Sequence, residues 1–165
     1  RDFCLSRGLG DVYKRQPYEE ASMEKASCGL YPYLFVTNDD PTVYLSLGMT
    51  YFGDKKLDMK SVRVETEDNY YDFTCGEEFI GGYDNDLKAW FAYELFDMDD
   101  STSWLNEWLA AKSVTATFTG RDGSTKTYTL TKDNLQAIRD VLNVYDTLLG
   151  SDVSTARVVL RSLVK

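Results

Sequence analysis

Apolar and polar residues alternate along one long stretch of this chain, and this alternation is the feature that most limits its fold. In residues 42–52, every second residue from Val43 to Met49 is apolar, and the intervening positions include Ser46 and Thr50. Successive side chains of a strand point to opposite faces, so the pattern predicts a strand with one buried face. A sheet built from such strands must be covered on its apolar side by a second layer.

Shorter segments with strand character surround this stretch. They are residues 31–36, 57–66, 70–75, 89–98, 113–119 and 125–130, and turn-forming Asn, Asp, Gly and Pro residues separate several of them. The apolar parity changes between Met59 and Val62, which predicts a β-bulge near residues 60–61. The Gly-Arg-Asp-Gly run at residues 120–123 predicts a hairpin turn. The stretch that contains residues 78–82 is expected to be a loop because it is rich in glycine.

Residues 102–112 have the spacing of a short helix. Trp104 and Trp108 fall on one face of it, and we expect both rings to lie in the core or at its rim. Residues 97–101 end the preceding strand and supply acidic and hydroxyl side chains suited to capping the start of this helix.

The strongest helical pattern lies near the C-terminus. Thr131 is placed to cap it, an apolar stripe runs through residues 135–149, and Gly150 follows. We expect this helix to lie across a sheet that contains residues 114–118 and 128–130. The predicted class is therefore α+β: an antiparallel sheet or sandwich of about six to eight strands, with a short Trp-rich helix and a C-terminal amphipathic helix packed on it.

The composition excludes several classes of site. The chain has 27 acidic and 18 basic residues, a net charge of −9 and no histidine. The commonest general base and zinc ligand is therefore missing, as are Ser-His and Cys-His nucleophiles. Nucleic acids and anionic membrane surfaces need basic partners, so we expect neither as a partner. No transmembrane segment is visible in the sequence, and we expect no direct membrane insertion of the observed segment. Residues 17–165 contain no phosphate-binding glycine motif, and we expect no cofactor.

The two cysteines of this region, Cys28 and Cys75, are far apart and lie outside any C-x-x-C motif. A structural zinc site is therefore not expected. A disulfide in an oxidising compartment and a pair of free apolar thiols both fit the sequence. The run at residues 26–29, Ala-Ser-Cys-Gly, is similar to the end of a lipoprotein signal, but the segment before it is charged rather than apolar.

Residues 1–16 resemble the translation of a transposon-based sequencing adapter. Residues 11–16 correspond in one reading frame to the codons GAT GTG TAT AAG AGA CAG of a transposase end sequence, and residues 1–2 match the adapter before the sample index. The resemblance implies that residues 1–16 are not native and should pack against nothing. We divide the rest into a linker or frayed lead-in at 17–29, a single domain at 30–150, and a tail or short helix at 151–165.

The domain resembles one found in uncharacterised exported or surface-attached proteins of anaerobic gut bacteria. The shared pattern is a short helix that leads into a hairpin and then a terminal amphipathic helix. Here it is carried by Leu109, Ala110, Val114, Phe118, residues 120–123, Leu130, Thr131, Ala137, Ile138, Val141, Leu142, Tyr145 and Leu148. The resemblance implies an extracytoplasmic or cell-surface location for an α+β domain, and it implies no catalytic residues.

Tyrosine is the residue type that most suggests a ligand, because its ring is apolar and its hydroxyl is polar. Tyr44, Tyr70, Tyr71 and Tyr93 are the candidate binding residues, for a carbohydrate or a protein. They also fit cross-strand pairs at the rim of a core. Our leading hypothesis is a non-catalytic extracytoplasmic domain that acts in binding or cell-surface interaction.

Carboxylates supply the alternatives. Asp97, Asp99 and Asp100 form a weak candidate for a metal site, although no calcium-loop template fits and we expect them to end a strand and cap a helix. A small glycosidase-like hydrolase that uses carboxylates is the alternative function, with Glu94, Asp97 and Asp99 as its candidate residues. We do not expect an enzyme.

Overall fold

The structure is a computed structural model, and it describes residues 5–6, 25–36, 43–77, 80–149, 151 and 158. Its elements are β1 (Leu5–Ser6), β2 (Gly29–Val36), β3 (Val43–Gly53), β4 (Met59–Glu65), β5 (Tyr70–Thr74), β6 (Ile80–Asp84), β7 (Ala89–Asp97), the 3-10 turn η1 (Asp99–Ser101), α2 (Thr102–Ala110), β8 (Thr115–Gly120), β9 (Thr125–Thr129) and α3 (Lys132–Leu149). The predicted α+β class, with its Trp-containing helix and its C-terminal helix, is confirmed.

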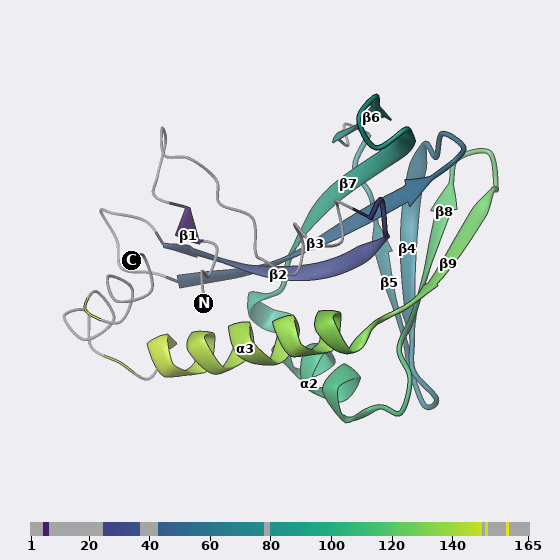
Figure 1. The fold of residues 1–165 in the computed structure, drawn as a ribbon. Helices are drawn as coiled ribbons and strands as arrows, with labels where there is room; N and C mark the ends of the chain where they lie inside the picture. The colour runs from purple at the N-terminus through teal and green to yellow at the C-terminus, as the bar shows by residue number, and fades with distance from the viewer. Residues whose placement is uncertain are drawn as a thin grey trace.

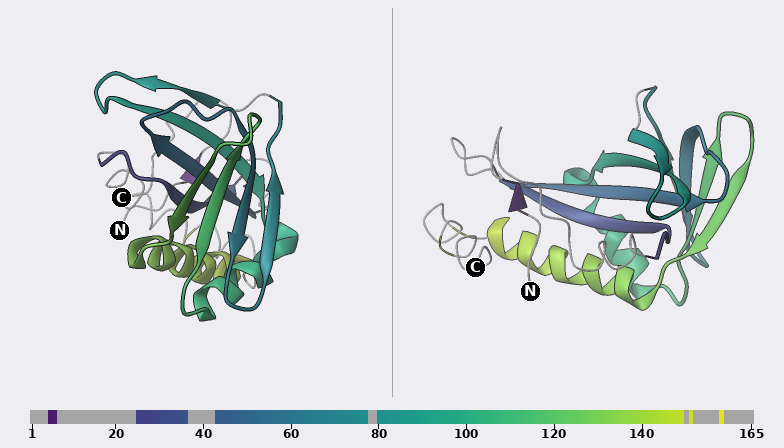
Figure 2. Two further views of the ribbon diagram at one scale, coloured as in Figure 1. Left: turned by 90° about the vertical axis from the view of Figure 1, so that its right-hand side faces the viewer. Right: turned by 45° about the horizontal axis from the view of Figure 1, so that its top comes forward.

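The strands form two sheets. The first has the order β1-β2-β3-β7-β6 and the second the order β5-β4-β8-β9. All pairs are antiparallel except β1 with β2. The long strands of the first sheet run along α3. The second sheet crosses one end of the first sheet, and α2 and α3 lie below both (Figure 1). Figure 2 shows the second sheet in front of the first when the molecule is turned by 90°.

Strand β3 contributes to two parts of the core. Near its start, the N–H of Leu45 donates to Asp99, which also accepts the hydroxyl of Tyr145 from α3. Near its end, the ring of Tyr51 contacts that of Phe118 on β8, with centroids 6.2 Å apart. The alternating residues predicted to be buried in β3 are therefore covered by a helix at one end and by the second sheet at the other.

The C-terminal helix lies where the sequence did not predict it. We expected α3 to cross the sheet that contains β8 and β9, but it runs beneath β2 and β3 of the first sheet (Figure 1). Its apolar stripe is as predicted, since Ile138, Val141 and Leu148 are buried. Periodicity identifies which face of a helix is covered, and it carries no information about which sheet covers that face.

The start of α3 is held by reciprocal hydrogen bonds. Oγ1 of Thr131 accepts the N–H of Asn134 at 3.2 Å, and Oδ1 of Asn134 accepts the N–H of Thr131 at the same distance. This is a capping box with Asn in place of the usual Glu or Gln, and it confirms Thr131 as the cap. Tyr128 of β9 also donates to Oδ1 of Asn134, at 2.8 Å, so the cap is joined to the second sheet.

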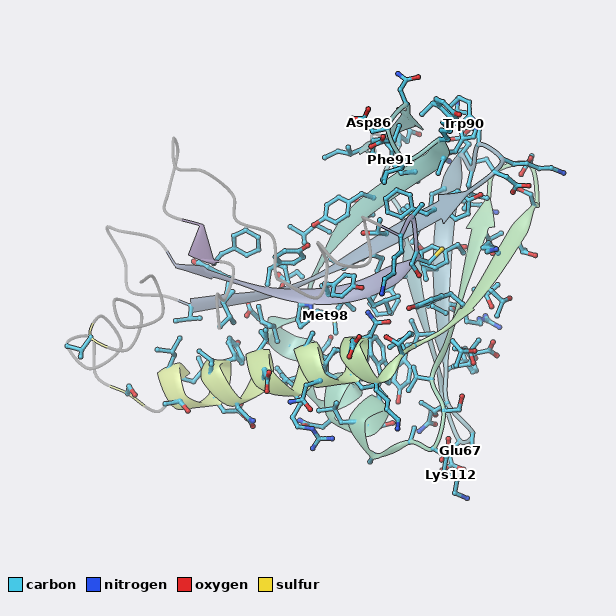
Figure 3. The ribbon with its side chains drawn as sticks, in the orientation of Figure 1. Glu67, Asp86, Trp90, Phe91, Met98 and Lys112 are labelled. Carbon is cyan, nitrogen blue, oxygen red and sulfur yellow. The ribbon has the colours of Figure 1, made fainter. Side chains whose placement is uncertain are left out.

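The short helix α2 is joined to the β4–β5 hairpin by side chains as well as by packing. Glu67 in the hairpin turn accepts the backbone N–H of Lys112 just after α2, and this bond lowers the pKa of Glu67. The two residues lie together at the foot of the second sheet (Figure 3). Tyr71 and Asn69 both donate to Oε2 of Glu107.

Two details of the second sheet agree with the predictions from the sequence. The pairing of β4 with β8 shifts between Met59 and Ser61, which places Lys60 in a bulge and confirms the predicted irregularity. The β8–β9 hairpin turns through Gly123, whose φ of +81° lies in the left-handed region that glycine adopts without strain. A change in apolar parity is thus a reliable local sign of a bulge in this chain.

Three predictions for the first sheet need correction. Residues 80–84 form strand β6 rather than a loop. The sheet also begins inside the segment predicted to be a linker, because Gly29 starts β2 and Cys28 is buried. Leu5 and Ser6 lie beside Leu34 and Phe35 as the two-residue strand β1, although we expected residues 1–16 to pack against nothing. The other residues of 1–16, residues 17–24, and nearly all of the predicted tail at 151–165 lie outside the described residues.

Aromatic rings cover glycines on the faces of the first sheet. A Cβ built on Gly48 would lie 2.6 Å from a ring atom of Tyr33 and 2.8 Å from the hydroxyl of Tyr93. Gly29 lies under the ring of Tyr31 in the same way, and Gly53 under that of Tyr51. These rings use the space that a side chain would otherwise occupy, so the glycines are required for packing.

Candidate functional site

The four candidate tyrosines do not form one site. Tyr71 is buried in the core, where its ring contacts Trp104 and Trp108, so it is not a binding residue on the surface. Tyr70, its neighbour in β5, is 63% exposed on the outer face of the second sheet. Tyr44 and Tyr93 lie on the outer face of the first sheet, as their register positions in β3 and β7 show.

The outer face of the second sheet carries an ordered array of hydroxyl groups. The registers of β5, β4, β8 and β9 place twelve outward residues in three rows that cross all four strands. We call this array the threonine face; its rows are Tyr70-Glu65-Thr115-Thr129, Asp72-Arg63-Thr117-Thr127 and Thr74-Ser61-Thr119-Thr125. Seven of its residues are threonine and one is serine. None of the twelve is buried.

Alternation places these hydroxyls on one side of the sheet. Within β8, Ala116 and Phe118 are buried, while Thr115, Thr117 and Thr119 are only partly covered. The hydroxyls of Thr117 and Thr127 lie 3.3 Å apart across the β8–β9 pair. The sequence shows alternating threonines within each strand. It does not show the cross-strand register that aligns these threonines into an array.

The charged residues of the threonine face are largely neutralised by one another. Arg63 donates two hydrogen bonds to Asp72, of 2.6 and 2.8 Å, and its guanidinium lies 4.6 Å from the centre of the Tyr70 ring. The hydrogen bonds raise the pKa of Arg63 and lower that of Asp72. Glu65 is the remaining charge of the array, so the twelve residues together carry a net charge of −1.

The outer face of the first sheet carries a second group of aromatic rings, and part of it is buried, since Tyr31 and Tyr33 are each 1% exposed and form a cluster with Ala137. Tyr93 and Tyr33 cover Gly48 there, and Tyr44 is 42% exposed two register positions from Ser46. Thr50 on the same face is 5% exposed, and its Oγ1 has no hydrogen-bond partner in the described part of the chain. This surface holds two of the predicted tyrosines, but it lacks the ordered hydroxyl array of the second sheet.

Two of the three acidic candidates, Asp97 and Asp99, have structural partners. Oδ1 of Asp99 accepts the N–H of Leu45 at 2.6 Å and the hydroxyl of Tyr145 at 2.8 Å, and Oδ1 of Asp97 accepts the N–H of Asp99. We expected this cluster to cap α2, but Ser101 at the N-cap makes no side-chain hydrogen bond. Among the described residues no group of three or more possible ligands is close enough to hold a metal ion.

Two of the three residues proposed for a hydrolase, Glu94 and Asp97, are separated by the sheet. Glu94 pairs with Met49 and Asp97 pairs with Ser46, so the two carboxylates belong to opposite faces of β7. Oε2 of Glu94 is buried and has no partner among the described residues, whereas Asp97 is exposed. Two carboxylates on opposite faces cannot flank one scissile bond.

Cys28 and Cys75 are free thiols and both are buried, which decides between the alternatives left open by the sequence. The Sγ of Cys28 lies 3.4 Å from the carbonyl oxygen of Phe52 and accepts its N–H at 3.3 Å. Burial raises the pKa of Cys28, and burial together with Glu94 raises that of Cys75 to about 12. Cys28 is therefore a core residue rather than a surface position for a lipid.

Comparison of the chain with protein-family models, with curated proteins and with solved structures found no match. Among the described helices, none is both long and apolar enough to cross a membrane.

Proposed function

We propose that this is a non-catalytic binding domain of an exported or surface-attached protein, and that its threonine face binds a neutral polysaccharide. The observation that carries the proposal is the in-register array of eight threonine and serine hydroxyls across four strands. Each hydroxyl can donate one hydrogen bond and accept others, which matches the hydroxyls of a sugar. The threonine methyl groups add apolar contact between them.

Charge supports a neutral ligand. Arg63, the cation in the array, is already paired with Asp72, so no free cation on this face is available to a phosphate or a sulfate. An anionic polymer would also meet the net charge of −9 of the chain. A cationic polymer would find a single uncompensated carboxylate, Glu65, among the twelve residues.

Tyr70 supplies the aromatic contact at one corner of the array. Its ring is 63% exposed, and the guanidinium of Arg63 lies over the ring and restricts its position. A ring that is held in place loses less conformational entropy when a sugar packs on it. The prediction that Tyr70 binds a ligand is kept in this proposal. Tyr44 and Tyr93 lie on the outer face of the first sheet and are not part of the proposed site.

The test is depletion from solution by insoluble cellulose, chitin and starch, followed by affinity electrophoresis in soluble glucans. We expect at least one neutral polysaccharide to retain the protein, with retention independent of salt because the contact is uncharged. Tyr70→Ala and Thr117→Lys should each weaken binding by about tenfold. Tyr44→Ala, on the outer face of the first sheet, is the matched control and should bind as the parent does.

Two results would overturn the proposal. One is the absence of retention by every neutral polysaccharide tested. The other is retention that Tyr44→Ala abolishes and Tyr70→Ala leaves unchanged, which would transfer the binding site to the first sheet. Circular dichroism of each variant establishes that the protein tested is folded.

A further inference from the structure

Strand β6 is an unprotected edge of the first sheet. In the described part of the chain no strand pairs with its outer side. Its sequence, Ile-Gly-Gly-Tyr-Asp, contains neither Lys nor Pro, and it pairs with β7 without a register shift. Sheet edges are normally protected by such residues or by bulges, because unpaired backbone groups otherwise add a further strand.

The side chains of this edge are apolar and exposed. Ile80 is 65% exposed and Tyr83 is 47% exposed. Tyr83 is held in place by Trp90 of β7, with ring centroids 5.3 Å apart in an edge-to-face contact. Trp90 and Asp86 lie at the end of the sheet that is remote from Glu67 and Lys112 (Figure 3), and β6 lies on the side of the sheet away from the helices (Figure 1).

We propose that β6 pairs antiparallel with β6 of a second copy of this chain, about a two-fold axis at Gly82. This register places Tyr83 opposite Gly81 of the partner subunit on one face of the joined sheet. Within the chain, tyrosine rings already cover Gly29, Gly48 and Gly53. In those contacts the ring comes from two residues along the same strand or from a diagonal position on a neighbouring strand. At the joined edge a tyrosine ring would cover a glycine directly opposite it, at two symmetric positions.

The charge of the edge is compatible with this register. Asp84 would lie opposite Ile80 of the partner subunit, and its Oδ1 already accepts the N–H groups of Asp86 and Leu87 at 2.9 Å. The carboxylate is thereby held within its own turn. Each copy carries a net charge of −9, so the dimer should be weak at low ionic strength and stronger when salt screens the repulsion.

Sedimentation velocity over a range of protein concentrations tests the proposal. We expect a monomer–dimer equilibrium that shifts toward dimer as sodium chloride is added. Ile80→Lys and Tyr83→Lys should each weaken the dimer at least tenfold, although both reduce the negative charge of the protein. Tyr44→Lys makes the same change in charge on the same sheet, away from β6, and should dimerise as the parent does.

Cross-linking gives a second measurement, because a disulfide traps the dimer even when only a small fraction of the protein is dimeric at equilibrium. Gly82→Cys places a thiol on the two-fold axis, and a Cβ at this position makes only ordinary contact, 3.6 Å from the Phe91 ring. With Cys4 changed to Ser, diamide should link Gly82→Cys into dimers much faster than Thr127→Cys on β9. Equal rates for these variants, a monomer at every concentration and salt, or a dimer that persists in Tyr83→Lys would each overturn the assignment.

Discussion

The hydroxyl of Tyr145 on α3 donates a 2.8 Å hydrogen bond to Oδ1 of Asp99, and the same oxygen accepts the N–H of Leu45 on β3 at 2.6 Å. One carboxylate oxygen therefore joins the C-terminal helix, the turn before α2 and the longest strand. Burial and the bond to Asp99 both raise the pKa of Tyr145.

Tyr145→Phe removes this donor and leaves the ring in place. Hydrogen bonds to charged groups contribute about 1.5–3 kcal/mol, so we expect unfolding in urea to show a loss of about 2 kcal/mol. Tyr44→Phe changes an exposed ring and should stay within about 0.5 kcal/mol of the parent. A loss that small for Tyr145→Phe would mean that the bond contributes nothing measurable.

The same bond predicts how stability depends on alkaline pH. Tyr145 and Tyr71 have folded-state pKa values above the ordinary value of 10.0, and that of Tyr71 is about 12. A group with a raised pKa stabilises the fold fully below its unfolded pKa and loses that contribution as the pH rises. The urea stability of the parent should fall between pH 10 and about 12, and its advantage over Tyr145→Phe should shrink there.

Gly48→Ala should be costly because its Cβ would lie 2.6 Å from the ring of Tyr33. Overpacking of this kind costs about 1–3 kcal/mol. Gly82→Ala in the same sheet is the matched control, since a Cβ there lies no closer than 3.6 Å to the Phe91 ring. Equal melting temperatures for the two variants would contradict the close packing of tyrosine on Gly48.

Ile138→Ala tests the apolar stripe of α3. Ile138 is fully buried, and truncation of such a residue to alanine costs about 2–5 kcal/mol. Arg139→Ala, at the next position of the helix and exposed, should cost little. A loss below about 0.5 kcal/mol for Ile138→Ala would place the side chain outside the core.

Calcium should not stabilise this protein. Oδ1 of Asp97 and Oδ1 of Asp99 already accept hydrogen bonds, from backbone N–H groups and from the hydroxyl of Tyr145. We expect the same thermal midpoint in excess EDTA and in millimolar calcium at matched ionic strength. A true site would raise the midpoint with ligand concentration, and a rise of several degrees with calcium but not with sodium would reveal one.

Deletion of residues 1–16 tests the resemblance to an adapter sequence. A segment that was never selected for packing should contribute nothing to stability, so the melting temperature should not change. Leu5 and Ser6 pair with β2, so a lower melting temperature after deletion could be assigned to the loss of this pairing. A clear drop on deletion would show that these residues stabilise the first sheet and would count against the adapter interpretation.

The parts of this fold that local pattern determines were predictable. The alternation in β3, the bulge at Lys60 and the cap at Thr131 each depend on a few neighbouring residues. Strand β6 was missed because its glycines weaken the local signal and its order comes from pairing with β7. The position of α3 on the first sheet depends on contacts that no local pattern encodes.

The candidate site also combines features that a local sequence pattern predicts with features that depend on how the strands pair. Tyr70 and Tyr71 are adjacent, so a strand can expose only one of them, and the register with β4 decides that it is Tyr70. The threonines of β8 and β9 are visible as two separate patterns in the sequence. Their alignment into rows, such as Thr117 beside Thr127, is a property of the assembled sheet.

The double role of β3 has a consequence for how the domain unfolds. Its start is bonded to a residue 54 positions away, Asp99, and its end packs on Phe118 of the second sheet. Neither the helical part of the core nor the part between the sheets can open without exposing one half of this strand. The slowest-exchanging amides of β3 should therefore exchange only by global unfolding, and the many distant contacts should make folding slow for a chain of this length.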